Sequence, residues 1–258
     1  MQRYITLKNA YSNNSTHIMK SLFFIFCMLV WFNAQADSKP VTTVTPLILT
    51  DKNTKGYELR GQANTLIELV KSKKLDEAQQ LAMQLRQSYE EQFNKNIKQY
   101  SFQSENEYTE FKKSSTEEFE WIDWGYKECL QMLAFIQSEK RNYQTAIEYL
   151  TKIEQIAPIS SSALIETGYV LNQLHHYNDA LAIYLKALDL SMQYSTQRPY
   201  KASIFRGIGF SFIELNELDE AEKAYQDALA LEPTNQVALK ELTYIQSLRE
   251  ANKAKKTP

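Results

Sequence analysis

Cysteine, glycine, proline and histidine are all scarce in this 258-residue chain, and each scarcity limits what the protein can be. The sequence contains 2 cysteines, 6 glycines, 6 prolines and 3 histidines. Two cysteines exclude a disulfide-rich scaffold, and so few glycines and prolines exclude collagen-like and low-complexity chains. There are 29 basic and 31 acidic residues, for a net charge of −2. The chain therefore lacks the overall positive charge that would indicate nucleic acid as a partner.

The chain contains only one long run of apolar residues, and this run lies near its N-terminus. From Met19 the chain reads MKSLFFIFCMLVWFNAQADSK, in which Lys20 precedes apolar residues 22–32 and an Ala-Gln-Ala sequence ends at Ala36. This order predicts a secretory signal peptide that is cleaved after Ala36. The run is short for a bilayer span, so an uncleaved inner-membrane anchor is the weaker alternative. We expect translation to start at Met19, which leaves residues 1–18 untranslated.

Export with one remaining cysteine has consequences for stability and location. Residues 1–36 contain three basic and no acidic residues, so their removal from 29 basic and 31 acidic ones leaves a net charge of −5. Cys129 then has no internal disulfide partner in an oxidising compartment, and its apolar neighbours favour a buried thiol. No Asn-x-Ser/Thr sequence follows Ala36, which favours the bacterial periplasm over a eukaryotic secretory route.

A 34-residue period runs through the second half of the chain. Ala146 and Ala180 are 34 residues apart, and Ala221 follows 41 residues later, which is one period with seven additional residues. We place these seven residues within 191–201, a segment rich in serine, threonine and proline. A period of this length predicts stacked helical units.

With these alanines in register, the chain resembles tetratricopeptide repeat (TPR) proteins over about residues 127–250. Small, aromatic and aliphatic residues occupy most signature positions of three repeats: Leu130, Leu133, Ala134, Ala146 and Pro158 in the first, Leu164, Gly168, Leu171, Ala180, Tyr184 and Ala187 in the second, and Phe205, Ile208, Gly209, Phe212, Ala221, Tyr225, Ala228 and Pro233 in the third. Gln137, Leu150, Ile153 and Thr167 depart from the pattern. The resemblance implies an all-α fold in which antiparallel helix hairpins stack as a solenoid, because one hairpin cannot bury its apolar face alone.

The rest of the chain is assigned around this core. The segment KKLDEAQQLAMQL at 73–85 is similar to NELDEAEKAYQDA, and its Ala78 precedes Ala146 by 68 residues, or two periods. We therefore expect two degenerate helical repeats within 57–126, the second of which carries no signature. A capping helix is expected over the last repeat from Val237, Leu242, Ile245 and Leu248. Residues 37–56 are interpreted as an extended linker and 251–258 as a basic tail.

Catalytic chemistry has little support in the sequence. His175 and His176 are adjacent at a predicted turn, so they point apart and do not suggest a shared metal. No nucleophile and base pattern is present, and we expect neither a cofactor nor enzyme activity. The alternative is an envelope hydrolase or cell-wall-associated enzyme whose site lies in the divergent segment 59–126.

The resemblance instead implies a concave groove that binds a protein or peptide and is lined by the first helix of each repeat. Carried onto this sequence, the groove positions are Gln131, Phe135, Ile165, Tyr169, Asn172, Arg206, Phe210 and Ile213, beside Glu128, Ser138, Ser162 and Ser203. One position is aromatic in all three repeats, and such rings either grip a partner or fill space between helices. The Lys, Asn and Arg clamp of the chaperone-binding TPR subclass is not transferred, because the groove offers only Arg206. The sequence predicts a periplasmic adaptor, in envelope assembly or in toxin neutralisation.

Overall fold

The computed structural model describes residues 54–256, with side chains described up to Lys253. The predicted signal peptide, the start at Met19 and most of the expected linker lie outside the described residues. Within residues 54–256 no helix is long and apolar enough to cross a membrane. These residues belong to one compact unit.

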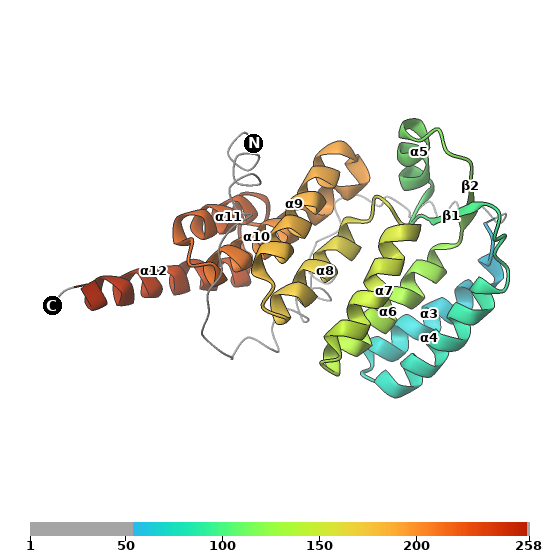
Figure 1. Ribbon diagram of the computed structural model, residues 1–258, viewed down its shortest axis with the longest axis horizontal. Helices are drawn as coiled ribbons and strands as arrows, with labels where there is room; N and C mark the ends of the chain where they lie inside the picture. The colour runs from blue at the N-terminus through green and yellow to red at the C-terminus, as the bar shows by residue number, and fades with distance from the viewer. Residues whose placement is uncertain (1–53, 257–258) are drawn as a thin grey trace. The chain divides into compact units, whose positions relative to one another are not determined.

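Antiparallel helix hairpins make up most of this unit, which confirms the predicted all-α TPR-type fold (Figure 1). A short helix, η1 (Tyr57–Leu59), leads into the first hairpin. The hairpins are α3 (Arg60–Lys71) with α4 (Leu75–Glu90), α6 (Trp124–Glu139) with α7 (Tyr143–Ile156), α8 (Ser161–Gln173) with α9 (Tyr177–Gln193), and α10 (Lys201–Glu214) with α11 (Leu218–Leu231), followed by α12 (Gln236–Lys256). Helices α7 and α11 each end two residues before a proline, as expected from Pro158 and Pro233.

All four hairpins turn in the same way. Three residues lie between the two helices of each hairpin, and the middle one is in the left-handed region: Lys73, Arg141, His175 and Asn216, with φ between 57 and 62°. In the α8/α9 turn the His175 N–H donates to the Asn172 carbonyl at 3.0 Å, and the next N–H donates to the Leu171 carbonyl at 2.9 Å. The other three turns have the same hydrogen bonds. This Schellman-type ending satisfies the last carbonyls of the first helix.

Small residues occur where the two helices of a hairpin cross. The alanine of the repeat is fully buried in every hairpin, at Ala78, Ala146, Ala180 and Ala221. Gly168 and Gly209 face tyrosine rings of the second helix, and a Cβ atom at these positions would come within 2.6 Å of Tyr184 and 2.7 Å of Tyr225. The close approach expected at Gly168, Gly209 and these alanines is therefore confirmed.

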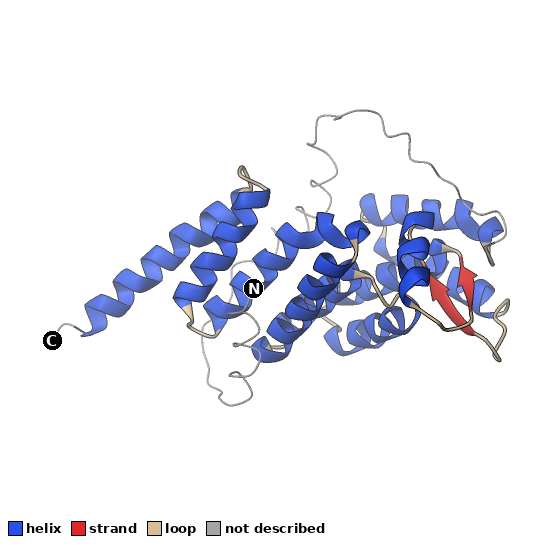
Figure 2. Ribbon diagram, turned by 90° about the horizontal axis from the view of Figure 1, so that it is seen from above, coloured by secondary structure: helices blue, strands red, loops and turns tan. Residues whose placement is uncertain are grey.

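The segment between α4 and α6 differs from the prediction. We expected a second degenerate helical repeat there, but the structure has β1 (Lys98–Ser101), α5 (Glu105–Ser114) and β2 (Phe119–Ile122), with the two strands paired in parallel (Figure 2). Helix α6 packs directly against α3 and α4, and the Lys140 Nζ atom contacts Asp76 Oδ1 at 2.8 Å. The inserted residues match one repeat in length, so a 34-residue period cannot distinguish an insertion from a repeat.

Both ends of the described chain are more ordered than the sequence indicated. Lys55, at the end of the expected linker, pairs in parallel with Ile122 and so extends the small sheet. The predicted capping helix is present as α12, and it continues to Lys256 through most of the expected basic tail. Its Arg249 guanidinium pairs with Asp219 and Glu222 of α11, which fixes α12 over the last hairpin.

Candidate interaction surface

The predicted groove residues lie on the first helices α6, α8 and α10, and we call the surface that they form with α12 the first-helix face. The structure leaves five of the eight partly exposed: Phe135, Ile165, Tyr169, Arg206 and Phe210. It buries the other three, Gln131, Asn172 and Ile213, to 4, 5 and 8% exposure. The surface available to a partner is therefore more aromatic than the sequence indicated.

Two polar residues of the predicted groove, Asn172 and Arg206, have partners within the chain. The Ser211 hydroxyl donates to Asn172 Oδ1 at 3.2 Å, which joins α10 to α8. The Arg206 guanidinium pairs with Glu232 at 2.5 Å and donates to the Ser203 hydroxyl at 2.7 Å. These contacts connect the helices, so neither side chain provides an unpaired group for a ligand.

The aromatic position of the first helices recurs once more than the sequence analysis recognised. Phe135, Tyr169 and Phe210 occupy equivalent positions, and Tyr244 of α12 follows Phe210 by one further period of 34 residues. Tyr244 is 40% exposed. Tyr244 could have been found from the sequence by continuing the 34-residue spacing from Phe210 into the capping helix. One ring thus stands at the same position in four successive first helices.

Two of these rings, Tyr169 and Tyr244, are each accompanied by a carboxylate that the sequence analysis also missed. Glu166 and Glu241 occupy equivalent positions in α8 and α12, and each lies one helical turn before a tyrosine, in the sequences ETGY and ELTY. Burial raises the pKa of Glu166 to about 7. Burial, together with the nearby Glu214 carboxylate, raises the pKa of Glu241 to about 7. Tyr169 and Tyr244 are therefore each flanked by a carboxyl group that is poorly solvated.

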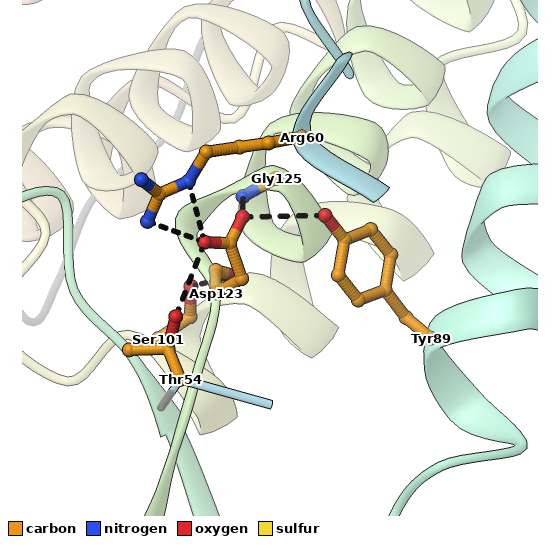
Figure 3. A network of polar contacts seen from close by, with 6 residues as sticks. All are labelled: Thr54, Arg60, Tyr89, Ser101, Asp123 and Gly125. Carbon is orange, nitrogen blue, oxygen red and sulfur yellow. Dashed lines mark hydrogen bonds and ion pairs between the residues drawn. The ribbon is translucent and has the colours of Figure 1, made fainter. Parts of the chain in front are cut away.

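The segment 59–126, considered for an enzyme site, contains a buried carboxylate at Asp123 (Figure 3). Its Oδ2 atom pairs with the Arg60 guanidinium at 2.5 Å, and its Oδ1 atom accepts from the Gly125 N–H at 2.9 Å and from the Tyr89 hydroxyl at 3.3 Å. The Ser101 hydroxyl donates to its backbone carbonyl at 3.1 Å. With 0% exposure and both oxygens engaged, Asp123 joins α3, α4, β1 and α6 rather than facing a cleft.

Aromatic residues of the same segment pack together beneath α5. Tyr100, Phe102, Ile159 and Tyr194 form their buried centre, and the Tyr108 and Trp121 rings stack at 4.4 Å with an interplanar angle of 5°. Tyr194 directly precedes η2 (Ser195–Tyr200), which lies within the segment 191–201 where the seven additional residues were predicted. The insertion after α4 and the insertion after α9 therefore share one core.

The histidine pair gives no sign of a shared site. The His175 Nδ1 atom lies 2.6 Å from the Tyr177 hydroxyl, whereas His176 Nδ1 lies 3.6 Å from Asp179. No group of three or more His, Cys, Asp or Glu side chains among the described residues is arranged to hold a metal ion. Cys129 is fully buried, as predicted, and burial raises the pKa of its thiol.

Comparison with known proteins supports the repeat fold. Residues 160–232 match the family model described as tetratricopeptide repeat, and no curated protein matches the chain. MamA 41-end from Desulfovibrio magneticus RS-1 is similar to 78% of this chain over 90% of its own, with a TM-score of 0.51 and 15% identity. The MamA RS-1 ArsTM double mutant gives the same coverage and identity with a TM-score of 0.50.

A shorter structure, the first TPR of Spaghetti (RPAP3) bound to an HSP90 peptide, is 22% identical over 48% of this chain and 93% of its own, with a TM-score of 0.43. At these identities the comparisons concern the fold alone. The family match spans helices α8 to α11, whose turns, crossings and terminal prolines are those described above. The chain therefore carries tetratricopeptide repeats within residues 160–232, as part of a larger all-α helical repeat.

Proposed function

We propose that this protein is an adaptor of the bacterial envelope that binds a partner protein on its first-helix face. The observation that carries the proposal is the ring at one equivalent position of four successive first helices: Phe135, Tyr169, Phe210 and Tyr244. Three of these rings are partly exposed and Tyr244 is exposed. Aromatic side chains supply large contact areas at protein interfaces and dominate their binding energy.

The alternative, that the rings only fill space between helices, predicts that removing them destabilises the fold. The double substitution Phe135→Ala and Phe210→Ala separates the two. We expect affinity-tagged protein with both changes to lose its partner from a native envelope extract while its helicity and melting temperature change little. A large loss of melting temperature would show that the rings belong to the core and would contradict the proposal.

The envelope location is supported by the sequence from Met19 to Ala36, which has the order of a secretory signal. N-terminal sequencing of the protein from a periplasmic fraction is expected to begin at Asp37. A protein that retains residues 19–36 would instead be anchored by its uncleaved signal. Neighbouring genes then distinguish a role in envelope assembly from neutralisation of a secreted toxin.

A further inference from the structure

We propose that the segment bound on the first-helix face is basic, with lysine or arginine side chains that pair with Glu166 and Glu241 and apolar residues that contact the neighbouring rings. The inference rests on the proposed function and specifies the chemistry of the partner. The basis for it is that two carboxyl groups on this face have no cationic partner among the described residues.

Glu241 provides the clearest case. Its side chain is buried to 4% exposure, and among the described residues neither a hydrogen bond nor an ion pair joins its carboxylate to another side chain. The charged group that acts on it most is another carboxylate, that of Glu214, which also raises its pKa. A buried carboxylate without a cationic partner is unfavourable, and a bound ammonium or guanidinium group would relieve it.

Glu166 repeats this arrangement in α8. It is partly buried and, like Glu241, has no ion pair among the residues that the structure describes. Arg206, the basic residue among the predicted groove positions, is already neutralised by Glu232 at 2.5 Å. Neither of these two carboxyl groups therefore has a basic partner among the described residues.

The rings add to the same preference. Tyr169 and Tyr244 each lie three residues after a glutamate, so carboxylate and ring are neighbours on the helix surface. The face of an aromatic ring attracts a cation, and the apolar stems of lysine and arginine pack against it. Phe210 lies between these two positions and Phe135 precedes both, and the two rings offer apolar contacts to other residues of the bound segment.

A random 12-residue peptide library displayed on phage tests the proposal with the full mature chain as bait. We expect the enriched peptides to contain an excess of lysine and arginine next to apolar residues. Their affinities, measured as labelled synthetic peptides by fluorescence anisotropy, are expected to fall about tenfold or more for Glu166→Gln and for Glu241→Gln, the range for a lost charged hydrogen bond. The matched control is Glu148→Gln, because Glu148 is exposed on the second helix α7; it is expected to leave affinity within about twofold.

Two other results would overturn the inference, and they differ in what they mean for the proposed function. Enriched peptides without basic residues, whose binding is lost with Phe210→Ala but unchanged by the glutamine variants, would refute the charge preference and leave the adaptor function standing. Absence of enrichment, or peptides insensitive to all of these substitutions, would contradict both. Circular dichroism on each variant confirms that the helices are intact before affinities are compared.

Discussion

Glu110 of α5 caps the start of η2 by accepting hydrogen bonds from Thr196, at 3.1 Å from its backbone N–H and at 2.7 Å from its hydroxyl. The same carboxylate accepts from the N–H and hydroxyl of Ser195. These residues belong to the two insertions into the array of hairpins, one after α4 and one after α9. The insertions therefore bind each other across the hairpins α6/α7 and α8/α9.

The pKa of Glu110 makes this contact dependent on pH. Partial burial acts to raise that pKa, but the hydrogen bonds from Ser195 and Thr196 outweigh it and lower the pKa from 4.5 to about 2. A depressed folded-state pKa stabilises the fold above pH 4.5, and that stabilisation is lost as the pH falls toward 2. We expect Glu110→Gln to lower the free energy of unfolding by about 1 to 2 kcal/mol at pH 6 and by less at pH 3. Urea denaturation at both pH values measures this.

Glu118→Gln is the matched control for that experiment, because Glu118 is an exposed carboxylate of the same insertion. It is expected to change the free energy of unfolding by less than about 0.5 kcal/mol at either pH. Equal losses for the two variants would show that Glu110 does not act through η2.

Glu241 has the opposite dependence. Its folded-state pKa of about 7 exceeds the ordinary value of 4.5, so the folded protein holds one more proton than the unfolded chain between these values. Stability therefore falls as the pH rises from 4.5 to 7. We expect Glu241→Gln to raise the free energy of unfolding by about 2 to 3 kcal/mol at pH 8 and to have little effect at pH 4.5. Thermal or urea denaturation that gave the same difference at both pH values would contradict this.

Helix propensity alone predicts that replacing a helical glycine with alanine stabilises the protein, but the packing at Gly209 predicts that this replacement destabilises it. A Cβ atom there would lie 2.7 Å from the buried Tyr225 ring, whereas a Cβ atom at Gly61 in α3 would meet nothing within 4 Å. Gly209→Ala is expected to destabilise the protein by about 1 to 3 kcal/mol. Gly61→Ala is expected to stabilise it by about 0.5 to 1 kcal/mol, the ordinary gain in a helix. Urea denaturation compares them, and a stabilising Gly209→Ala would contradict the described crossing.

In the α3/α4 hairpin, a glycine substitution is expected to stabilise the protein at one lysine and to destabilise it at another lysine two residues away. Lys73 has a φ of 57° in the α3/α4 turn, which costs a lysine about 1 kcal/mol relative to glycine. Lys73→Gly is therefore expected to raise the free energy of unfolding by about 0.5 to 1 kcal/mol. Lys71→Gly, in the last turn of α3, is expected to lower it by about 0.5 to 1 kcal/mol. Chemical denaturation of the two variants measures both changes. A left-handed turn predicts opposite signs for them, whereas a frayed helix end does not.

The buried ion pair at Asp123 is expected to matter far more than an exposed one. Asp123→Ala removes the partner of Arg60 and the acceptor for Gly125 and Tyr89, and we expect a loss of about 3 to 5 kcal/mol. The comparison is Asp76→Ala, because Asp76 pairs with Lys140 at an exposed site. This loss is expected to be much smaller, because solvent screens an exposed ion pair. Similar losses by urea denaturation would mean that Asp123 is not a centre of the fold.

The repeat was predictable from the sequence because its requirements are local and recur. Ala146, Ala180 and Ala221 mark helix crossings that tolerate little beyond a methyl group, and the structure buries each of them completely. The region before them was predicted wrongly as a second helical hairpin. An insertion that matches the period keeps Ala78 in register, so the spacing of the alanines does not reveal it. The parallel pairing of β1 with β2 is a non-local contact, which local sequence patterns do not predict.

The candidate site was predicted in part. The positions of Phe135, Tyr169 and Phe210 follow from the period, and the structure leaves them partly exposed. Asn172 was assigned to a partner, but its carbonyl accepts from Ser211 of the next repeat, a contact that depends on how two hairpins stack. Tyr244 and Glu241 lie in a helix that the sequence analysis interpreted only as a cap, although the period reaches them.

The adaptor function is tested most directly by photo-crosslinking in the native envelope. A photoreactive phenylalanine analogue is placed at Phe210 on the first-helix face and, in a second variant, at Gln226, which is exposed on the second helix α11. The account predicts a crosslinked partner from position 210 and none from position 226. Equal crosslinking from both positions, or a partner captured only from position 226, would contradict it.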